Sequence, residues 1–147
     1  MSKRSKILNA LVDKLKDIDG TGTYNSNLSK NVFPRLKFYD EVDEYPEVYV
    51  TTGTEQRDYL PGGFKWAYLL ITIRVYVSDD NEAELRLEEI FEDIENIIDE
   101  NGNLEYDTNQ YTEDIKILSI MTDEGLLSPI GVGEITLQVM YDLNAPC

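Results

Sequence analysis

The residues from Phe64 to Gly102 change from a two-residue period to a helical period, and this change limits the folds that the chain can adopt. Apolar side chains first occupy every second position, at Ala67, Leu69, Ile71, Ile73, Val75 and Val77. Because successive side chains of a strand point to opposite faces, the pattern predicts a long strand with one face in the core. The positions between them hold aromatic, aliphatic and polar side chains: Trp66, Tyr68, Leu70, Thr72, Arg74 and Tyr76. That second face is too apolar for free solvent and too polar for a dry core, so we expect it to meet another surface.

A helix is predicted directly after this strand. Asp79 lies three residues before Glu82, the spacing of a weak capping box, and Gly102 is the predicted stop. The helix carries one apolar stripe, formed by Ala83, Leu87, Ile90, Phe91, Ile94, Ile97 and Ile98. Its other face holds the single base Arg86 among many acids: Glu82, Glu84, Glu88, Glu89, Glu92, Asp93, Glu95 and Asp99. We expect this acidic face to be solvated or to face a partner, while the stripe packs on the strand as the nucleus of an α+β layer.

The other segments extend this nucleus in both directions. Residues 3–18 have a second apolar helical stripe, which ends before Gly20 and Gly22. Further strands are predicted at residues 32–39, 48–52, 115–121 and 130–143. Pro34 restricts the first of these to a sheet edge or a strand start, because proline donates no hydrogen bond. Between the elements we expect loops at residues 21–31 and 53–63, an acidic connection at 40–47, a polar stretch at 103–114 and a turn at 122–128.

This order of elements predicts the fold class. We expect an α+β protein with a single mostly antiparallel sheet of about four to five strands and two helices packed on one face. Residues 1–147 are expected to form one domain, with a short flexible C-terminal extension at residues 144–147.

The net charge of −16 is unevenly distributed. Residues 1–37 hold eight bases and three acids, whereas the remainder holds five bases and 26 acids. The acidic body argues against direct binding of a nucleic-acid backbone. It favours either a basic partner surface or simple solubility, and the basic head of one copy could attract the acidic body of another.

Hydropathy and cysteine content further narrow the classes of protein to which the chain can belong. The chain has no apolar run long enough to cross a bilayer and no signal-peptide region, so we expect no membrane partner and synthesis in a cytoplasm. Cys147 is the only cysteine, which excludes an intrachain disulfide. It is a candidate for an intermolecular disulfide, and an incidental free thiol is the alternative.

Patterns that carry catalysis are missing from the sequence. The chain has no histidine and no nucleophile-elbow, phosphate-loop or paired-cysteine motif. Asp17 and Asp19 begin a partial calcium loop, but Leu28 occupies the position that needs a bidentate glutamate, and a second partial match from Asp99 fails earlier. The acids of the second helix could hold Mg²⁺ only if they converged in a pocket, and a solvated face is the simpler interpretation. We therefore predict no enzymatic activity, no cofactor and no metal site.

The segment from Thr54 to Leu60 mixes charged, aromatic and aliphatic side chains. Arg57 and Tyr59 are of the types that anchor protein contacts, so the segment suits a binding loop. An ordinary hairpin excursion explains the same residues, and both interpretations remain open here.

Several segments together resemble the tail terminator (tail completion) proteins of long-tailed bacteriophages. The similarity lies in the opening helix around residues 8–11, the segment 45–53 with Tyr45 where phenylalanine is commoner, the strand 69–77, the helix after it, and residues 123–125 and 133–141. The resemblance implies a non-enzymatic virion protein that forms a ring, usually hexameric, at the head-proximal end of the tail tube. Such a ring stops tube polymerisation and gives the head–tail connector a docking surface, while DNA passes through it without sequence-specific binding.

A ring needs one surface patch to meet a different patch on the next copy. We expect the following residues at subunit or tube contacts: Arg57, Tyr59, Trp66, Tyr68, Arg74 and Tyr76. A competing hypothesis is an acidic decoy that mimics DNA and occupies a host DNA-binding protein. A metal-dependent nuclease is a third class.

Overall fold

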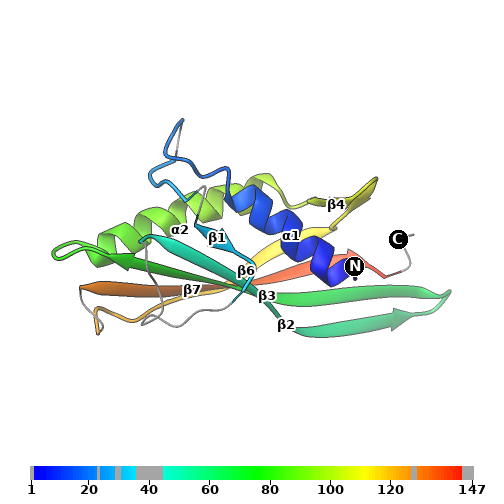
Figure 1. Ribbon diagram of the computed structural model, residues 1–147. Coiled ribbons are helices and arrows are strands. Elements are labelled where there is room, and N and C mark those ends of the chain that lie inside the picture. Colours follow the sequence, from blue (N-terminus) through cyan, green and yellow to red (C-terminus); the bar gives the residue numbers. More distant parts are fainter. Residues whose placement is uncertain (1, 23, 29–30, 36–44, 127–128, 144–147) are drawn as a thin grey trace.

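The computed structural model describes residues 2–22, 24–28, 31–35, 45–126 and 129–143. Its two helices are α1 (Lys3–Leu15) and α2 (Ala83–Glu100). Its strands are β1 (Val32–Phe33), β2 (Glu47–Leu60), β3 (Phe64–Ser78), β4 (Glu105–Asp107), β5 (Gln110–Tyr111), β6 (Asp114–Thr122) and β7 (Ile130–Asp142). A five-stranded sheet has the order β1-β2-β3-β7-β6, and β4 and β5 form a small second sheet. Only the β1–β2 pair is parallel within the large sheet. Both helices lie on one face of this sheet (Figure 1), so the predicted fold class is confirmed.

The core lies between the helices and the sheet. The predicted inner positions of β3, from Ala67 to Val77, are all buried, and α2 covers them with Ile90, Phe91 and Ile94. The stripe of α1 is buried in the same cluster. The two apolar periods in the sequence therefore meet as predicted, because burial of these faces is the main favourable term of folding.

Gly133 of β7 allows α2 to approach the sheet closely. A β-carbon at this position would lie 2.2 Å from Cζ of Phe91, so no larger residue fits without movement of the helix or the ring. Gly131, two positions earlier on the same face, is similarly crowded by Val77 and Leu87. Because neither glycine has a side chain, the first half of α2 packs directly against the backbone of β7.

The ends of the helices differ in part from the prediction. Asp79 Oδ1 accepts the backbone N–H of Glu82 at 2.9 Å, as one half of the predicted capping box requires, but the N-cap of α2 is Glu82 itself, whose side chain makes no capping hydrogen bond. The predicted position of the stop is confirmed, because α2 ends at Glu100 with Asn101 as its C-cap and Gly102 as the residue after the cap, although Gly102 does not adopt a left-handed conformation. The side-chain amide of the C-cap residue Asn101 donates to Ile97 O at 2.8 Å and so satisfies one of the last carbonyl groups of the helix. Helix α1 ends at Leu15 rather than at residue 18, although Ile18 is still buried.

Strand β2 is much longer than predicted. The predicted loop at residues 53–63 is wrong up to Leu60, because β2 runs through these residues and pairs with β3 from Glu55 onward. A register shift between Thr52 and Glu55 marks the start of this extension. Only residues 61–63 form the turn, where Gly62 (φ +89°) and Gly63 (φ +84°) supply the left-handed conformations. Residues 53–65, here called the arm, extend past the N-terminal end of α1 (Figure 1).

Three smaller elements complete the comparison with the sequence. Strand β1 lies at a sheet edge, as Pro34 predicts, and covers only Val32–Phe33 of the predicted strand at 32–39. The polar stretch at 103–114 contains the β4–β5 hairpin, which the sequence pattern did not predict. Most of the acidic connection and the extension at 144–147 lie outside the described residues.

Candidate assembly surfaces

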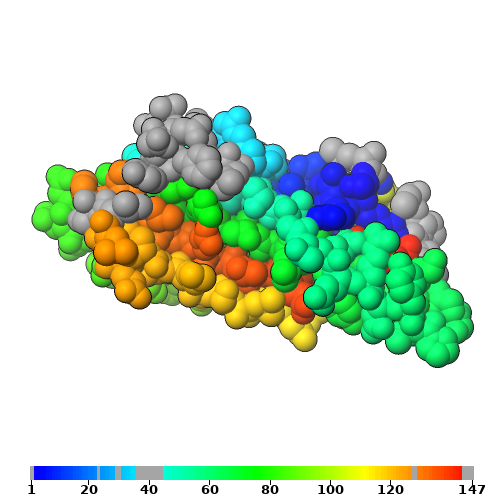
Figure 2. Space-filling model, turned by 90° about the horizontal axis from the view of Figure 1, so that it is seen from below, coloured from blue at the N-terminus to red at the C-terminus, as the bar shows by residue number. Residues whose placement is uncertain are grey.

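The sheet face opposite the helices carries the outward side chains of β3. Figure 2 shows β2, β3, β7 and β6 side by side on this face. Trp66, Tyr68 and Arg74 are half-buried there, whereas Tyr76 is only 2% exposed. The expectation that this face meets another surface stays a prediction for the first three residues, whereas Tyr76 offers little surface to any partner.

Tyr76 is buried by the chain's own aromatic and charged groups. Its ring meets that of Tyr49 edge-on at 5.8 Å, and the ring of Tyr49 stacks on Phe33 at 5.5 Å. The Tyr49 hydroxyl donates to Glu47, and burial together with this hydrogen bond raises the Tyr49 pKa. The end of the face around Tyr76 is consequently packed against side chains of the same chain.

Arg74, on the same face, forms an ion pair with Glu134 of β7. Burial disfavours its charged form, but hydrogen bonds to Glu134 and Tyr76 outweigh burial and raise the Arg74 pKa. The guanidinium therefore links β3 to β7, because Arg74 and Glu134 are directly paired across the ladder.

The other two predicted contact residues, Arg57 and Tyr59, lie on the arm. They pair with Ala67 and Lys65 across the β2–β3 ladder, and Ala67 is a core-face position, so they point to the side of the sheet that carries the helices. The six predicted residues thus occupy two opposite faces. Tyr59 is 62% exposed, and the neighbouring tip residues Leu60 and Phe64 are also exposed.

The root of the arm is held by three contacts. Arg4 Nη2 donates to Gly53 O at 2.5 Å, which joins α1 to β2 at the position of the register shift. The Tyr141 hydroxyl donates to Glu55, and Arg57 Nε donates to the same carboxylate at 2.8 Å. Burial, and next the hydrogen bond with Glu55, raise the Tyr141 pKa. These contacts give the arm a defined direction at its base.

The two outer edges of the sheet differ in sequence. Strand β6 is the outermost strand on one side, and its Leu118, Ile120 and Met121 are exposed. On the other side β1 pairs only with Val48 and Tyr49, so the rest of β2 has no strand beside it among the described residues. Exposed strand edges with apolar side chains are templates for pairing with another chain.

A groove of about 240 Å³ lies between α2 and the end of β6. Its lining consists of Glu84, Leu87, Glu88, Thr122 and Glu124, and we call it the α2–β6 groove. Three of these five side chains are acids, and Glu84 and Glu88 lie one helical turn apart. The groove can therefore receive a cationic or hydroxyl-bearing group from a partner.

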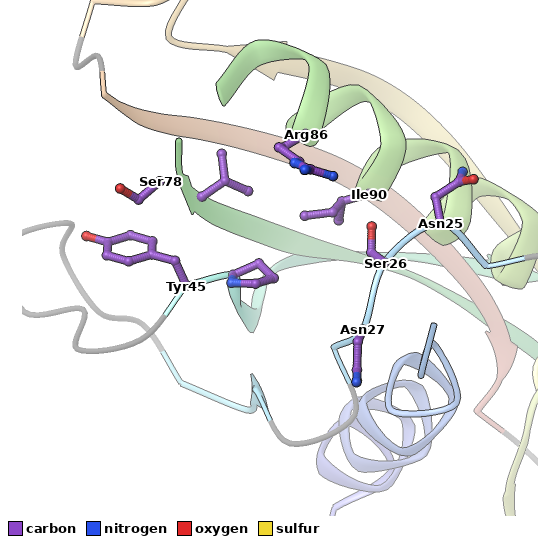
Figure 3. Close-up of a pocket in the computed structure, with 9 residues that line it drawn as sticks. Asn25, Ser26, Asn27, Tyr45, Ser78, Arg86 and Ile90 are labelled. Atoms are coloured by element: carbon purple, nitrogen blue, oxygen red, sulfur yellow. The ribbon is translucent and has the colours of Figure 1, made fainter. Parts of the chain in front are cut away.

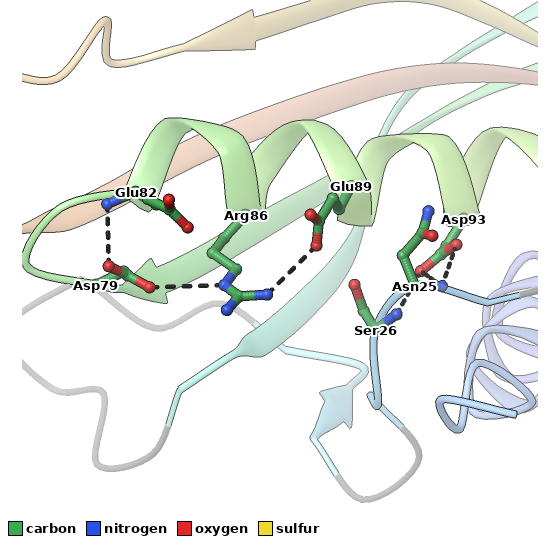
Figure 4. A network of polar contacts seen from close by, with 7 residues as sticks. All are labelled: Asn25, Ser26, Asp79, Glu82, Arg86, Glu89 and Asp93. Atoms are coloured by element: carbon green, nitrogen blue, oxygen red, sulfur yellow. Dashed lines mark hydrogen bonds and ion pairs between the residues drawn. The ribbon is translucent and has the colours of Figure 1, made fainter.

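A second hollow, of about 280 Å³, lies where α2 faces the segment 25–27 (Figure 3). Asn25 and Ser26 approach it from this segment, and Arg86 and Ile90 approach it from α2 (Figure 3). Arg86 also contacts Asp79 at 3.5 Å and Glu89 at 3.4 Å (Figure 4). These groups can form hydrogen bonds but include no nucleophile activated by a base.

Asp93 contradicts the prediction that every acid of α2 lies on a solvated or partner-facing surface. Its side chain is fully buried, and its carboxylate accepts the backbone N–H groups of Asn25 and Ser26, each at 2.9 Å (Figure 4). The physical reason is that the loop after α1 lies against α2, and a carboxylate satisfies its two backbone donors.

Three further predictions concern metal sites, membrane-spanning helices and disulfides. In the part of the chain that the structure describes, no three side chains of metal-binding type are arranged to hold a metal ion. Neither α1 nor α2 is long and apolar enough to span a bilayer. Cys147, the candidate for an intermolecular disulfide, lies outside the described residues.

An α+β subunit with exposed sheet edges, a projecting arm and no reactive pocket among its described residues is typical of a protein that assembles with other chains. Comparison with known proteins identifies the family. Residues 1–145 match the family described as bacteriophage tail tube terminator protein. The chain is 38% identical over 152 residues to tail tube terminator protein p142 of Escherichia phage T5, covering 96% of this chain and 94% of the relative. The chain therefore belongs to the bacteriophage tail tube terminator family and is a structural protein of the virion tail.

A solved structure has the same fold at low sequence identity. One chain from a structure described as the virion of a native gene transfer agent particle superposes with a TM-score of 0.63 at 10% identity. The match covers 97% of this chain and 98% of that chain. The resemblance that the sequence segments suggested is thus confirmed at the level of family and fold.

Proposed function

We propose that this protein forms a closed ring of identical subunits at the head-proximal end of the tail tube. In this proposal the ring is a hexamer, it stops further addition of tube subunits, and its free side docks the head–tail connector. The protein acts by binding alone and has no catalytic activity. The name of the T5 relative, a tail tube terminator, supports the first part of the proposal.

The observation that carries the ring is the difference between the two sheet edges. One edge is β6, with exposed aliphatic side chains, and the other is β2 beyond Tyr49, which continues into the arm. Two unlike patches on opposite sides of one subunit favour a head-to-tail contact, and such contacts close into rings when the rotation per subunit divides a full turn. A self-complementary dimer would need the same patch on both partners.

The net charge of −16 is consistent with a conduit for DNA. Negative side chains near the passage would repel the phosphate backbone and prevent adhesion of DNA to the wall. The family match over residues 1–145 favours this role over the acidic decoy.

The first test is the native mass of the purified full chain, measured by light scattering and native mass spectrometry over a range of protein and salt concentrations. A discrete species of six subunits, together with arrest of tube growth on addition of the protein to assembling tube subunits, is the expected result. A chain that stays monomeric both in solution and on tubes would contradict the ring.

The contact residues are tested with Trp66→Ala and Arg57→Glu, because they lie on opposite faces of the β2–β3 hairpin. Lys16→Glu, at the exposed C-cap of α1, is a matched control for the charge change. Each of the first two variants should weaken ring formation or tube capping. If both still assemble and cap tubes, the assignment of these residues to contacts is wrong.

A further inference from the structure

We propose that the helix-side face of the arm binds the α2–β6 groove of a second copy of the chain. This inference rests on the proposed ring and names the two surfaces that meet in it. The occupant of the groove is thus the arm of the neighbouring subunit rather than the tube protein.

The helix-side face of the arm exposes cations and an aromatic ring. Lys65 Nζ lies 5.8 Å from the centre of the Tyr59 ring, and the side chain of Arg57 is 48% exposed. The single carboxylate on this face, Glu55, is 5% exposed and already accepts from Arg57 and Tyr141. Asp58 pairs with Trp66 and so lies on the opposite face. The surface that the arm offers here is therefore free of exposed carboxylates, although the chain as a whole is strongly acidic.

The α2–β6 groove has the complementary chemistry. Glu84, Glu88 and Glu124 line it, and none of its five lining residues is a base. Exposed aliphatic side chains lie nearby in the sequence, at Ile120 on β6 and at Leu126 in the turn after it. A guanidinium would find carboxylates here, and the aromatic and aliphatic arm tip would find apolar surface.

The topology of the sheet brings the two surfaces to the same side. Ile120 of β6 pairs with Ile135, a core-face residue, so Ile120 lies on the side of the sheet that α2 covers. Residues that pair across two strands point to the same face of a sheet. If the free edge of β2 in one copy aligns with the free edge of β6 in the next, Arg57 and Tyr59 face the neighbour's α2. The arrangement of two copies that aligns these strand edges therefore also brings the cations of the arm to the side of the neighbour's carboxylates.

The overall charge explains why this contact is needed. Two copies that each carry a net charge of −16 repel one another at long range. A stable contact must place the few exposed cations against carboxylates and keep other carboxylates away. Such a contact is weakened by salt, because screening reduces the attraction between the paired groups.

A charge-exchange series tests the inference with the full chain. Arg57→Glu and Glu88→Arg should each raise the subunit dissociation constant about tenfold or more, since each places like charges together. Arg57→Ala also removes the pair with Glu55 but adds no repulsion, so it should have a smaller effect. The double variant R57E/E88R restores opposite charges and should return the dissociation constant to within about threefold of the wild type.

Two controls carry the same charge changes elsewhere. Lys16→Glu lies at the end of α1, and Asp99→Arg lies near the far end of α2 from the groove. Both should leave the dissociation constant within about twofold of the wild type, because exposed charges outside a contact contribute little. Circular dichroism of every variant confirms that the fold is retained.

The outcomes separate this inference from the proposed ring. Restored assembly in the double variant supports the arm–groove contact. A double variant that assembles worse than either single variant would overturn the contact and leave the ring intact. Single variants that form normal rings but fail to cap tubes would assign the arm to the tube protein, which also overturns the inference. A wild-type chain that never self-associates would overturn the ring, and the contact with it.

Discussion

The buried carboxylate of Asp93 in α2 accepts the backbone N–H of Asn25 at 2.9 Å, which attaches the loop after α1 to the second helix. The contact joins positions 68 residues apart in the sequence. It also explains why one acid of an otherwise exposed acidic helix is fully buried. A buried carboxylate is tolerated when backbone donors surround it.

Replacement of Asp93 by alanine should lower the free energy of unfolding by about 1–3 kcal/mol, because the N–H groups of Asn25 and Ser26 would lose their acceptor. Urea unfolding followed by circular dichroism measures the change. The control is Glu92→Ala, which removes an exposed acid next to it and should change stability by less than about 0.5 kcal/mol. Equal effects of the two substitutions would contradict the structural role assigned to Asp93.

Gly133 should not tolerate a side chain. We expect Gly133→Ala to destabilise the fold by about 1–3 kcal/mol, since its β-carbon would lie 2.2 Å from the Phe91 ring. Phe91→Leu removes the crowded ring atom, so the double variant should be more stable than the sum of the two single effects predicts. Gly102→Ala is the matched control, because its nearest contact would be 3.9 Å away. Additive effects in thermal unfolding would argue against this clash.

The Tyr141 hydroxyl should make stability fall at alkaline pH. Its pKa is raised in the folded chain by burial and by the hydrogen bond to Glu55, so the unfolded chain loses this proton first as the pH rises past about 10. Stability from this group is therefore present below that pH and decreases above it. Tyr141→Phe should cost about 0.5–1.5 kcal/mol at neutral pH, and its deficit should stay constant up to about pH 9 and shrink between about pH 10 and pH 12. A deficit that stays constant over this range in urea titrations would refute the linkage.

Asp107 should contribute in the opposite direction at acid pH. The hydrogen bond from Lys6 Nζ, at 2.6 Å, lowers the pKa of this carboxyl and joins α1 to β4. The stabilisation is present above the unfolded value of about 3.9 and is lost as the pH falls through the lower folded value. Lys6→Met keeps the apolar stem, so the stability difference from the wild type should narrow as the pH decreases from about 5 to about 2. A difference that is independent of pH would show that the ion pair is not responsible.

Periodicity predicted the elements whose faces differ strongly in polarity. The inner face of β3, the stripe of α2 and the alternation of β7 all became core, because a buried apolar face requires a regular spacing. The arm gave no such pattern. Its side chains are exposed on both faces from Gln56 to Leu60, so nothing in the sequence distinguishes its strand from a loop. Its pairing with β3 is fixed by the ladder and by the contacts at Gly53 and Glu55.

The candidate contact residues also divide into features that the sequence predicted and features that only the structure revealed. Composition identified Arg57, Tyr59, Trp66 and Tyr68 as side chains suited to an interface, and the structure leaves all four at least partly accessible. Tyr76 has the same alternation but is buried against Tyr49, which depends on a strand almost 30 positions away. The acidic groove between α2 and β6 could not be predicted, because it forms where two segments from different parts of the chain meet.

The sequence by itself determined the α+β class, the position of the core faces, the lack of histidine chemistry and the resemblance to tail terminators. These properties follow from local spacing and composition, which every residue carries with it in the unfolded chain. Only the tertiary structure decided that the arm projects as paired strands, that Asp93 is buried, and that the exposed cations of the arm and the carboxylates of the α2–β6 groove lie on separate surfaces. Each of these depends on which distant segments pack together, and that choice is made by the free energy of the whole fold rather than by any local pattern.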